Sequence, residues 1–100
     1  MITSDQVLAA SKRLGFDIIS GDFYDGTGCC PLSLMYIERT GRVPNCLGFA
    51  SEVCGYWGLL ETKSFYVGFD YDYDSSVCSG PWSDRGRLIK KELDAHIRKN

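Results

Sequence analysis

Three aspartates alternate with tyrosines in the segment YVGFDYDYDSS, residues 66–76, and such a row of carboxylates could bind a metal ion. Asp70, Asp72 and Asp74 match the first, third and fifth positions of a calcium-binding loop, whose oxygen ligands surround one ion. The sixth position of such a loop needs a glycine for a sharp turn, and the twelfth needs a bidentate glutamate. Here they are Ser75 and Pro81. The spacing therefore argues against a calcium site.

Two other interpretations of these residues remain open. In the first, the carboxylates are solvated and Tyr71 and Tyr73 pack partly on the other side of an extended stretch or helix end. In the second, the segment is a contact surface, since tyrosine gives rigid amphipathic area and carboxylates accept hydrogen bonds from a basic partner. The segment GDFYDG, residues 21–26, repeats this chemistry. If the fold brings both segments together, we expect a partner-binding surface made of Asp22, Tyr24, Asp25, Asp70, Tyr71, Asp72, Tyr73 and Asp74.

A pair of adjacent cysteines before a proline is the second feature that could carry chemistry. Cys29 and Cys30 precede Pro31, and a thiol at the start of a helix can have a lowered pKa and act as a nucleophile. None of the cysteines has the Cys-x5-Arg spacing of phosphatases, and no Cys-x-x-Cys motif occurs. We therefore expect buried structural thiols. A small thiol- or metal-dependent enzyme using Cys29 or Cys30 is the alternative.

Motifs for metals and cofactors are absent from the sequence. Structural zinc sites use ligand pairs a few residues apart, whereas the two adjacent cysteines project in different directions and the other three are isolated. Neither of the glycine-rich phosphate-binding motifs, Gly-x-x-x-x-Gly-Lys-Ser/Thr or Gly-x-Gly-x-x-Gly, is present. We therefore expect no metal, no cofactor and no enzymatic activity.

Charge is divided unevenly along the chain, with consequences for partners. Residues 1–84 carry eleven acidic and five basic side chains, whereas residues 85–100 carry six basic and two acidic ones. The acidic body makes direct binding to nucleic acid unfavourable at long range. No export signal or membrane-spanning stretch is recognisable, and the five cysteines are an odd number, so we expect a cytoplasmic protein with free thiols. Its oligomeric state cannot be predicted.

The elements that position these residues are expected to be mostly helices. Thr3 and Gln6 fit a capping box and Gly15 a helix end, which predicts a helix over residues 4–14. A second helix should begin at Pro31 and run to Gly41. Between them, residues 16–28 contain turn-forming glycines and aspartates and should be a loop or a short irregular hairpin.

The second half of the chain is less clearly patterned. Apolar residues at near-helical spacing predict a helix over residues 49–60, although two glycines interrupt it. Thr62 could cap a further helix that includes residues 63–71, where Phe65, Val67 and Phe69 alternate as in a strand. We choose helix. Ser83 and Asp84 are expected to cap a final amphipathic helix.

Three of these segments together resemble small uncharacterised helical proteins of bacteria and their phages. They are CCPLSLMYI at a helix start, SFYVGFDYD, and GRLIKKEL near the end. The resemblance implies a helical domain in which Phe65 to Asp70 form a packing and turn element, and a phage or mobile-element context. It provides no catalytic residues, and the extended Asp-Tyr repeat departs from the pattern.

These observations predict one globular domain over residues 1–100, large enough to bury a core. Its fold class should be mainly α, a helical bundle of four to five helices with long glycine-containing loops. An α+β fold is the alternative. We hypothesise a non-enzymatic protein–protein interaction module, such as a phage-encoded inhibitor or adaptor. It would present the acidic and aromatic surface to a basic site on a host protein, for example a nucleic-acid-binding site.

Overall fold

The computed structural model describes residues 2–45, 48–71 and 80–99, and within these ranges the chain is mainly α, as predicted. Five α-helices occur there: α1 (Ser4–Leu14), α2 (Pro31–Thr40), α3 (Phe49–Trp57), α4 (Leu59–Tyr66) and α5 (Pro81–Lys99). A π-helix, η1 (Val67–Tyr71), continues α4. The strands β1 (Asp17–Ile18) and β2 (Gly28–Cys29) form one short parallel pair.

The first helix has the predicted bounds and the predicted cap. The backbone amide of Gln6 donates to Thr3 Oγ1 at 3.3 Å, and the amide of Thr3 donates to Gln6 Oε1 at 3.1 Å. Gly15 ends α1 in the left-handed conformation with φ 79°. These hydrogen bonds satisfy amide groups that the first turn of a helix leaves unpaired.

The helix α2 begins at Pro31, as predicted, and is the centre of the core. The thiol of Cys30 caps it by accepting a hydrogen bond from the amide of Ser33 at 3.4 Å. Every residue from Pro31 to Ile37 is buried, so the first two turns of α2 are covered on all sides. The core around it is formed by residues that include Ile2, Val7, Phe49, Val53, Phe65, Phe69, Ile89 and Leu93.

Three start and end points in the second half differ from the prediction. Gly58, with φ 101°, separates α3 from α4, so the helix expected over 49–60 is divided. Thr62 lies inside α4 and does not cap it. Its hydroxyl donates to the carbonyl of Gly58 at 2.7 Å. Because α5 already begins at Pro81, Ser83 lies in its first turn, where its hydroxyl donates to the carbonyl of Ser64 at 3.0 Å.

The segment between α1 and α2 contains a short irregular hairpin, as predicted, in which Tyr24 pairs with Cys29 in antiparallel register. It also contains a parallel strand pair that was not predicted. Asp17 pairs with Gly28 and Ile18 pairs with Cys29 in a parallel register. A Cβ atom on Gly28 would lie 2.6 Å from the carbonyl oxygen of Asp17, so a side chain at this position would push the strands apart. The prediction missed this pair because each strand has only two residues and no alternating pattern.

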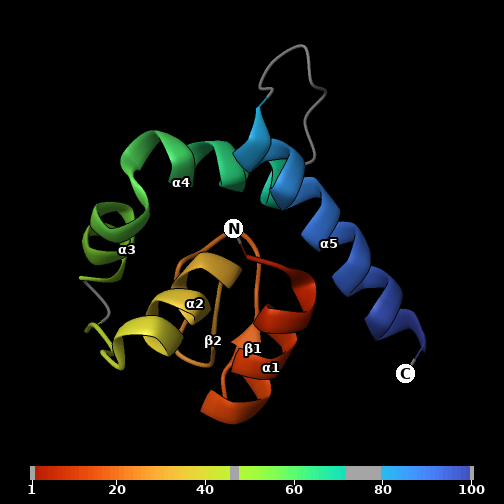
Figure 1. Ribbon diagram of the computed structural model, residues 1–100. Coiled ribbons are helices and arrows are strands. Elements are labelled where there is room, and N and C mark those ends of the chain that lie inside the picture. Colours follow the sequence, from red (N-terminus) through yellow and green to blue (C-terminus); the bar gives the residue numbers. More distant parts are fainter. Residues whose placement is uncertain (1, 46–47, 72–79, 100) are drawn as a thin grey trace.

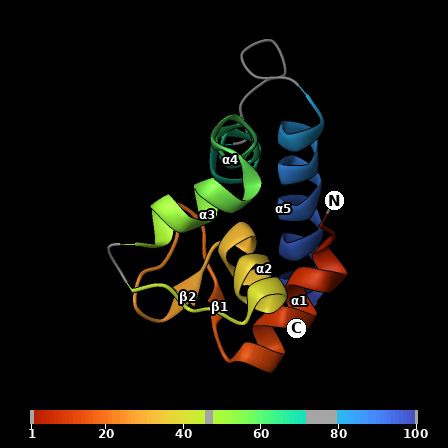
Figure 2. The same cartoon turned by 60° about the vertical axis from the view of Figure 1, so that its left-hand side comes forward.

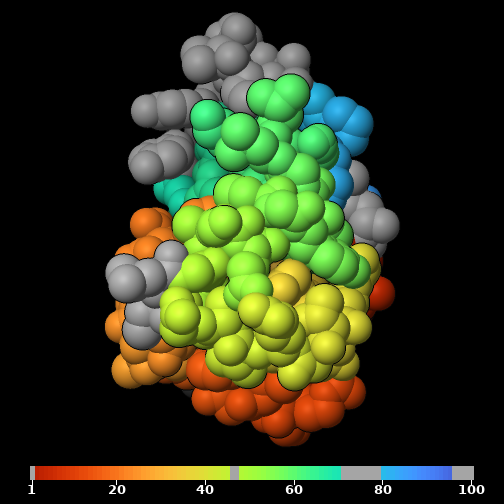
Figure 3. All heavy atoms as spheres, turned by 90° about the vertical axis from the view of Figure 1, so that its left-hand side faces the viewer, coloured from red at the N-terminus to blue at the C-terminus, as the bar shows by residue number. Residues whose placement is uncertain are grey.

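The helices are arranged as an arch over the N-terminal elements. In Figure 1, α3, α4 and α5 follow one another around α2 and α1, and the contacts close the circle from α5 back to α1. Figure 2 shows α5 standing beside α4 and α1. In Figure 3, α3 and α4 form the upper part of one face, above α2 and the N-terminal elements. Among the residues that the structure describes, none of the helices has the length and apolar character that a bilayer crossing requires.

Candidate functional site

A cavity of about 560 Å³ opens between the loop after β1 and the helices α3 and α4 with η1. We call it the Tyr66 pocket. Its lining combines carboxylates, aromatic rings, a thiol and a lysine, and includes Asp22, Phe23, Cys54, Lys63, Tyr66 and Asp70. Small-molecule and side-chain binding sites commonly have this combination of apolar walls with a few polar groups.

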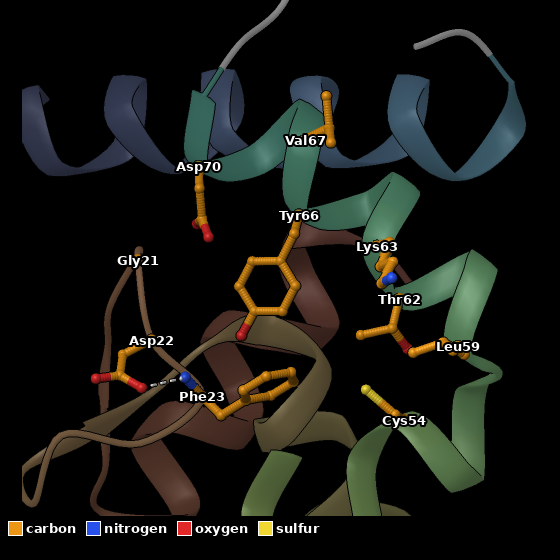
Figure 4. Close-up of a pocket in the computed structure, with 10 residues that line it drawn as sticks. All are labelled: Gly21, Asp22, Phe23, Cys54, Leu59, Thr62, Lys63, Tyr66, Val67 and Asp70. Atoms are coloured by element: carbon orange, nitrogen blue, oxygen red, sulfur yellow. Dashed lines mark hydrogen bonds between the residues drawn. The ribbon is translucent and has the colours of Figure 1, made fainter. Parts of the chain in front are cut away.

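Two aspartates that the sequence places far apart meet at this pocket. Figure 4 shows Asp70 and Tyr66 pointing from η1 and the end of α4 toward the loop that carries Gly21 and Asp22. Cys54 lies toward the other end of the view. The fold therefore brings the segments 21–26 and 66–71 together, which was the condition for a shared acidic and aromatic surface.

The loop side of the pocket is held by a local hydrogen bond and a ring contact. Asp22 is exposed, and its Oδ1 accepts a hydrogen bond from the amide of Phe23 at 2.9 Å (Figure 4). The ring of Phe23 meets the ring of Tyr66 edge to face, with centroids 4.9 Å apart and planes at 71°. This geometry is favourable for aromatic pairs, and it joins the loop to α4.

Oδ1 of Asp70 is buried at the pocket without a hydrogen-bond partner among the described residues. The hydroxyl of Tyr66 is also buried, close to the thiol of Cys30. Burial raises the pKa of Asp70, while the backbone of Gly21 and the charge of Lys90 lower it. Burial also raises the pKa of Tyr66. Buried polar atoms in proteins nearly always have partners, so Oδ1 of Asp70 marks unused hydrogen-bonding capacity.

The π-helix η1 carries Asp70 and forms one wall of the pocket. Within it, Gly68 is buried against the first turn of α5, where a Cβ atom would collide with the carbonyl oxygen of Ser83. π-helical turns are rare and occur frequently at functional sites. The unusual backbone is thus found in the segment that contributes the partly buried carboxylate of Asp70.

The other predicted surface residues of the loop have structural contacts. Asp25 Oδ1 accepts hydrogen bonds from the amides of Thr27 and Gly28, both at 2.9 Å, and from the hydroxyl of Thr27. The backbone hydrogen bond from Thr27 is the main cause that lowers the pKa of Asp25. The ring of Tyr24 stacks on Phe49 with centroids 4.7 Å apart. Neither Tyr24 nor Asp25 lines the Tyr66 pocket.

The remaining predicted surface residues cannot be placed relative to the pocket. Asp72, Tyr73 and Asp74 lie outside the described residues, and for Tyr71 only the backbone is described. Conversely, the sequence reasoning did not single out Tyr66, Cys54 or Lys63. No local signal marked these three, because they become neighbours only through the packing of α3 and α4 against the loop.

The adjacent cysteines are enclosed in the core. Cys29 and Cys30 are at most 1% exposed. Burial raises the pKa of Cys29 to about 12, and it also raises the pKa of Cys30, against hydrogen bonds from Ser33 and Tyr66. Cys54 is partly buried at the pocket. Within the described residues, no group of three or more metal-ligating side chains is gathered in one place.

Comparison with known proteins finds no matching family model, no similar curated protein and no similar solved structure. The resemblance to small helical proteins of bacteria and phages stays a prediction. Function therefore has to be inferred from the geometry and chemistry of this chain.

Proposed function

We propose that the protein is a non-enzymatic protein–protein interaction module that presents an acidic and aromatic surface, centred on the Tyr66 pocket, to a basic site on a partner. One observation carries this proposal: Asp22 and Asp70 line the same pocket, and Oδ1 of Asp70 is buried without a partner among the described residues. A cationic side chain donates strong, charge-assisted hydrogen bonds to such a carboxylate.

The surroundings of the pocket support the same function. Phe23 and Tyr66 supply rigid aromatic contact area, which is enriched where binding energy is concentrated in interfaces. The acidic excess over residues 1–84 would accelerate association with a basic partner. A nucleic-acid-binding site on that partner would suit this surface, because carboxylates can take the positions of phosphates. A phage-encoded inhibitor or adaptor would act in this way.

The cysteine geometry favours the binding module over the thiol enzyme. Catalysis by cysteine needs a thiolate that a substrate can reach. Cys29 and Cys30 are buried, and burial raises the pKa of each thiol. The hydroxyl of Ser33 lies 3.3 Å from the Cys30 thiol and is also fully buried, so the neighbouring polar group is as enclosed as the thiol itself.

The test of this function compares the parent protein with two variants, each used as the immobilised bait in a capture experiment. The two variants lose the same number of charges at different places. The first variant carries Asp22→Asn and Asp70→Asn, and the matched control carries Asp5→Asn and Asp17→Asn, both exposed and outside the pocket lining. A protein captured by the parent is purified, and its affinity for all three baits is measured by calorimetry at two salt concentrations.

We expect the pocket variant to bind the purified partner about tenfold more weakly, the control to match the parent within about twofold, and added salt to weaken the parent most. Equal affinity of the parent and the pocket variant would contradict the proposal. So would a partner whose interaction surface is acidic.

A further inference from the structure

We infer that the Tyr66 pocket receives the guanidinium group of an arginine side chain from the partner protein. This inference rests on the proposed function and narrows the basic site to one type of side chain. Four properties of the pocket lead to it: its size and lining, its buried acceptor atoms, its aromatic rings, and the charges around it.

The size and lining of the pocket fit a long side chain. A cavity of about 560 Å³ is far larger than a metal ion requires. Its walls include the apolar side chains of Leu59 and Val67 and the rings of Phe23 and Tyr66. Arginine can lay its methylene stem along apolar surface while its charged head reaches polar groups.

The buried acceptor atoms fit a planar donor with several N–H groups. Oδ1 of Asp70 lacks a partner among the described residues, the hydroxyl oxygen of Tyr66 has only the Cys30 thiol close by among the interactions found, and both side chains point toward the loop that carries Asp22 (Figure 4). A guanidinium carries five N–H donors in a rigid fork and can reach two acceptors at once. Both atoms are closed off from solvent, so entry requires a rotation of the Asp70 or Tyr66 side chain.

The aromatic rings favour arginine over lysine. Guanidinium is more weakly hydrated than ammonium and stacks on aromatic faces, so it loses less on entering a partly closed aromatic cavity. The rings of Phe23 and Tyr66 both line the pocket, where they meet edge to face with planes at 71°. A lysine ammonium is a compact charge with stronger hydration, so its desolvation on entering the cavity would cost more free energy than that of a guanidinium.

The charges around the pocket set the direction of entry. Lys63 lines the wall formed by α4, and like charge repels an incoming cation there. Asp22 from the loop and Asp70 from η1 attract it. Lys90 on α5 lowers the pKa of Asp70 by its charge, so the guanidinium must compete with Lys90 for this carboxylate.

The probe is the capped peptide acetyl-Gly-Arg-Gly-amide. It is compared with two peptides in which lysine or citrulline replaces the arginine. Citrulline keeps the shape of arginine and lacks the charge. The peptides are titrated into the ¹⁵N-labelled protein, and amide resonances are followed by NMR. We expect saturable shifts at Gly21, Asp22, Tyr66 and Asp70, with the arginine peptide bound about tenfold more tightly than either comparison peptide.

Variants assign the contacts. Asp70→Asn should weaken the arginine peptide about tenfold, Tyr66→Phe about threefold, and the control Asp17→Asn less than twofold, following the relative strength of charged and neutral hydrogen bonds. Free arginine is titrated in parallel. Tighter binding of free arginine than of the capped peptide would assign the pocket to a small molecule and overturn the partner side chain.

Other results overturn the inference without deciding the proposed function. Equal affinity for arginine and lysine peptides, lost in Asp70→Asn, would reject the preference for guanidinium and still support a basic partner. If no peptide shifts the pocket resonances, the pocket is not an arginine site. The bait comparison then decides separately whether the acidic surface binds a partner.

Discussion

Gly86 on α5 lies directly against the backbone of Phe65 on α4, so closely that a Cβ atom on Gly86 would collide with the carbonyl oxygen of Phe65. Gly68 makes the reciprocal approach to Ser83. The hydroxyl of Ser83 also donates to the carbonyl of Ser64 across this contact. Two helical segments therefore meet backbone to backbone, and this contact supports the wall of the Tyr66 pocket.

The first prediction concerns this close approach. Gly86→Ala should lower the free energy of unfolding by about 1–3 kcal/mol. The methyl group forces the two helices apart, and the free-energy cost of this overpacking exceeds the gain from the higher helix propensity of alanine. The matched control is Gly55→Ala in α3, where a Cβ atom meets no atom within 4 Å. The control should be stabilised by roughly 0.5–1 kcal/mol. Urea denaturation measures both, and equal effects of the two substitutions would contradict the packing argument.

The caps of the first helix and the bounds of the second could be predicted from sequence, whereas the later helix boundaries could not. Thr3, Gln6 and Gly15 act on their own helix, so a short stretch contains the whole signal. Thr62 and Ser83 have the residue types of caps, but their hydroxyls bond to carbonyls inside or between helices. For Ser83 the partner lies on another helix, so packing overrides the local preference. Thr62 cannot cap α4 because this helix already begins at Leu59, after Gly58.

The candidate site was predictable in its chemistry and not in its geometry. The carboxylates of Asp22 and Asp70 were recognised from the repeated acidic and aromatic segments. Their meeting depends on the parallel pairing of β1 with β2 and on η1, neither of which has a local signature. Asp25 belongs to the predicted surface by residue type, yet its carboxylate is used to fold the loop.

The second prediction concerns the link between α3 and α2. Trp57 Nε1 donates to the carbonyl of Leu32 at 3.0 Å, and the guanidinium of Arg39 lies 4.9 Å from the Trp57 ring centroid. Trp57→Phe keeps an aromatic ring and removes the donor, and should cost about 1–2 kcal/mol of unfolding free energy. The exposed Tyr56→Phe serves as control and should change it by less than about 0.5 kcal/mol. An unchanged stability of Trp57→Phe would show that this hydrogen bond is not important.

The third prediction concerns the thiols. At mildly alkaline pH, iodoacetamide should modify Cys54 in the native protein much faster than Cys29 or Cys30, which are buried and have raised pKa values. Peptide mapping by mass spectrometry measures the three rates separately. In denaturant without reductant, all three should react completely, because they are free thiols. Fast native modification of Cys30 would revive the thiol-enzyme alternative.

The fourth prediction concerns Asp25 and acid. Hydrogen bonds from the loop, first of all from the backbone of Thr27, lower the pKa of Asp25 below its ordinary value of 3.8. Its ionised form therefore stabilises the fold above the ordinary pKa, and this contribution disappears as pH falls through the lowered value. Asp25→Asn should lower the melting temperature at neutral pH, and the difference from the parent should shrink in acid. The exposed Asp5→Asn is the control. A difference that stays constant with pH would exclude this explanation.

The fifth prediction concerns Asp70, whose pKa is shifted in the opposite direction. Burial raises its pKa above the ordinary value of 3.8, although the Gly21 backbone and the charge of Lys90 oppose the shift. The native state therefore binds the proton more tightly than the unfolded chain, and Asp70 destabilises the fold increasingly as pH rises from 3.8 through the raised value. At neutral pH, Asp70→Asn should be as stable as the parent or more stable. Thermal unfolding across the pH range measures this difference.

Binding of the arginine peptide should show the reverse dependence on pH, because the guanidinium pairs with the ionised carboxylate of Asp70. Affinity should rise as pH increases through the raised pKa and then level off, and Asp70→Asn should remove this dependence. The other groups near this carboxylate are Lys90, Asp22 and Tyr66, and the last two line the same pocket. Asp17→Asn should retain the dependence. If Asp70→Asn unfolds more easily than the parent and binds the peptide equally well, Asp70 has a structural role and the pocket does not recognise cations through it.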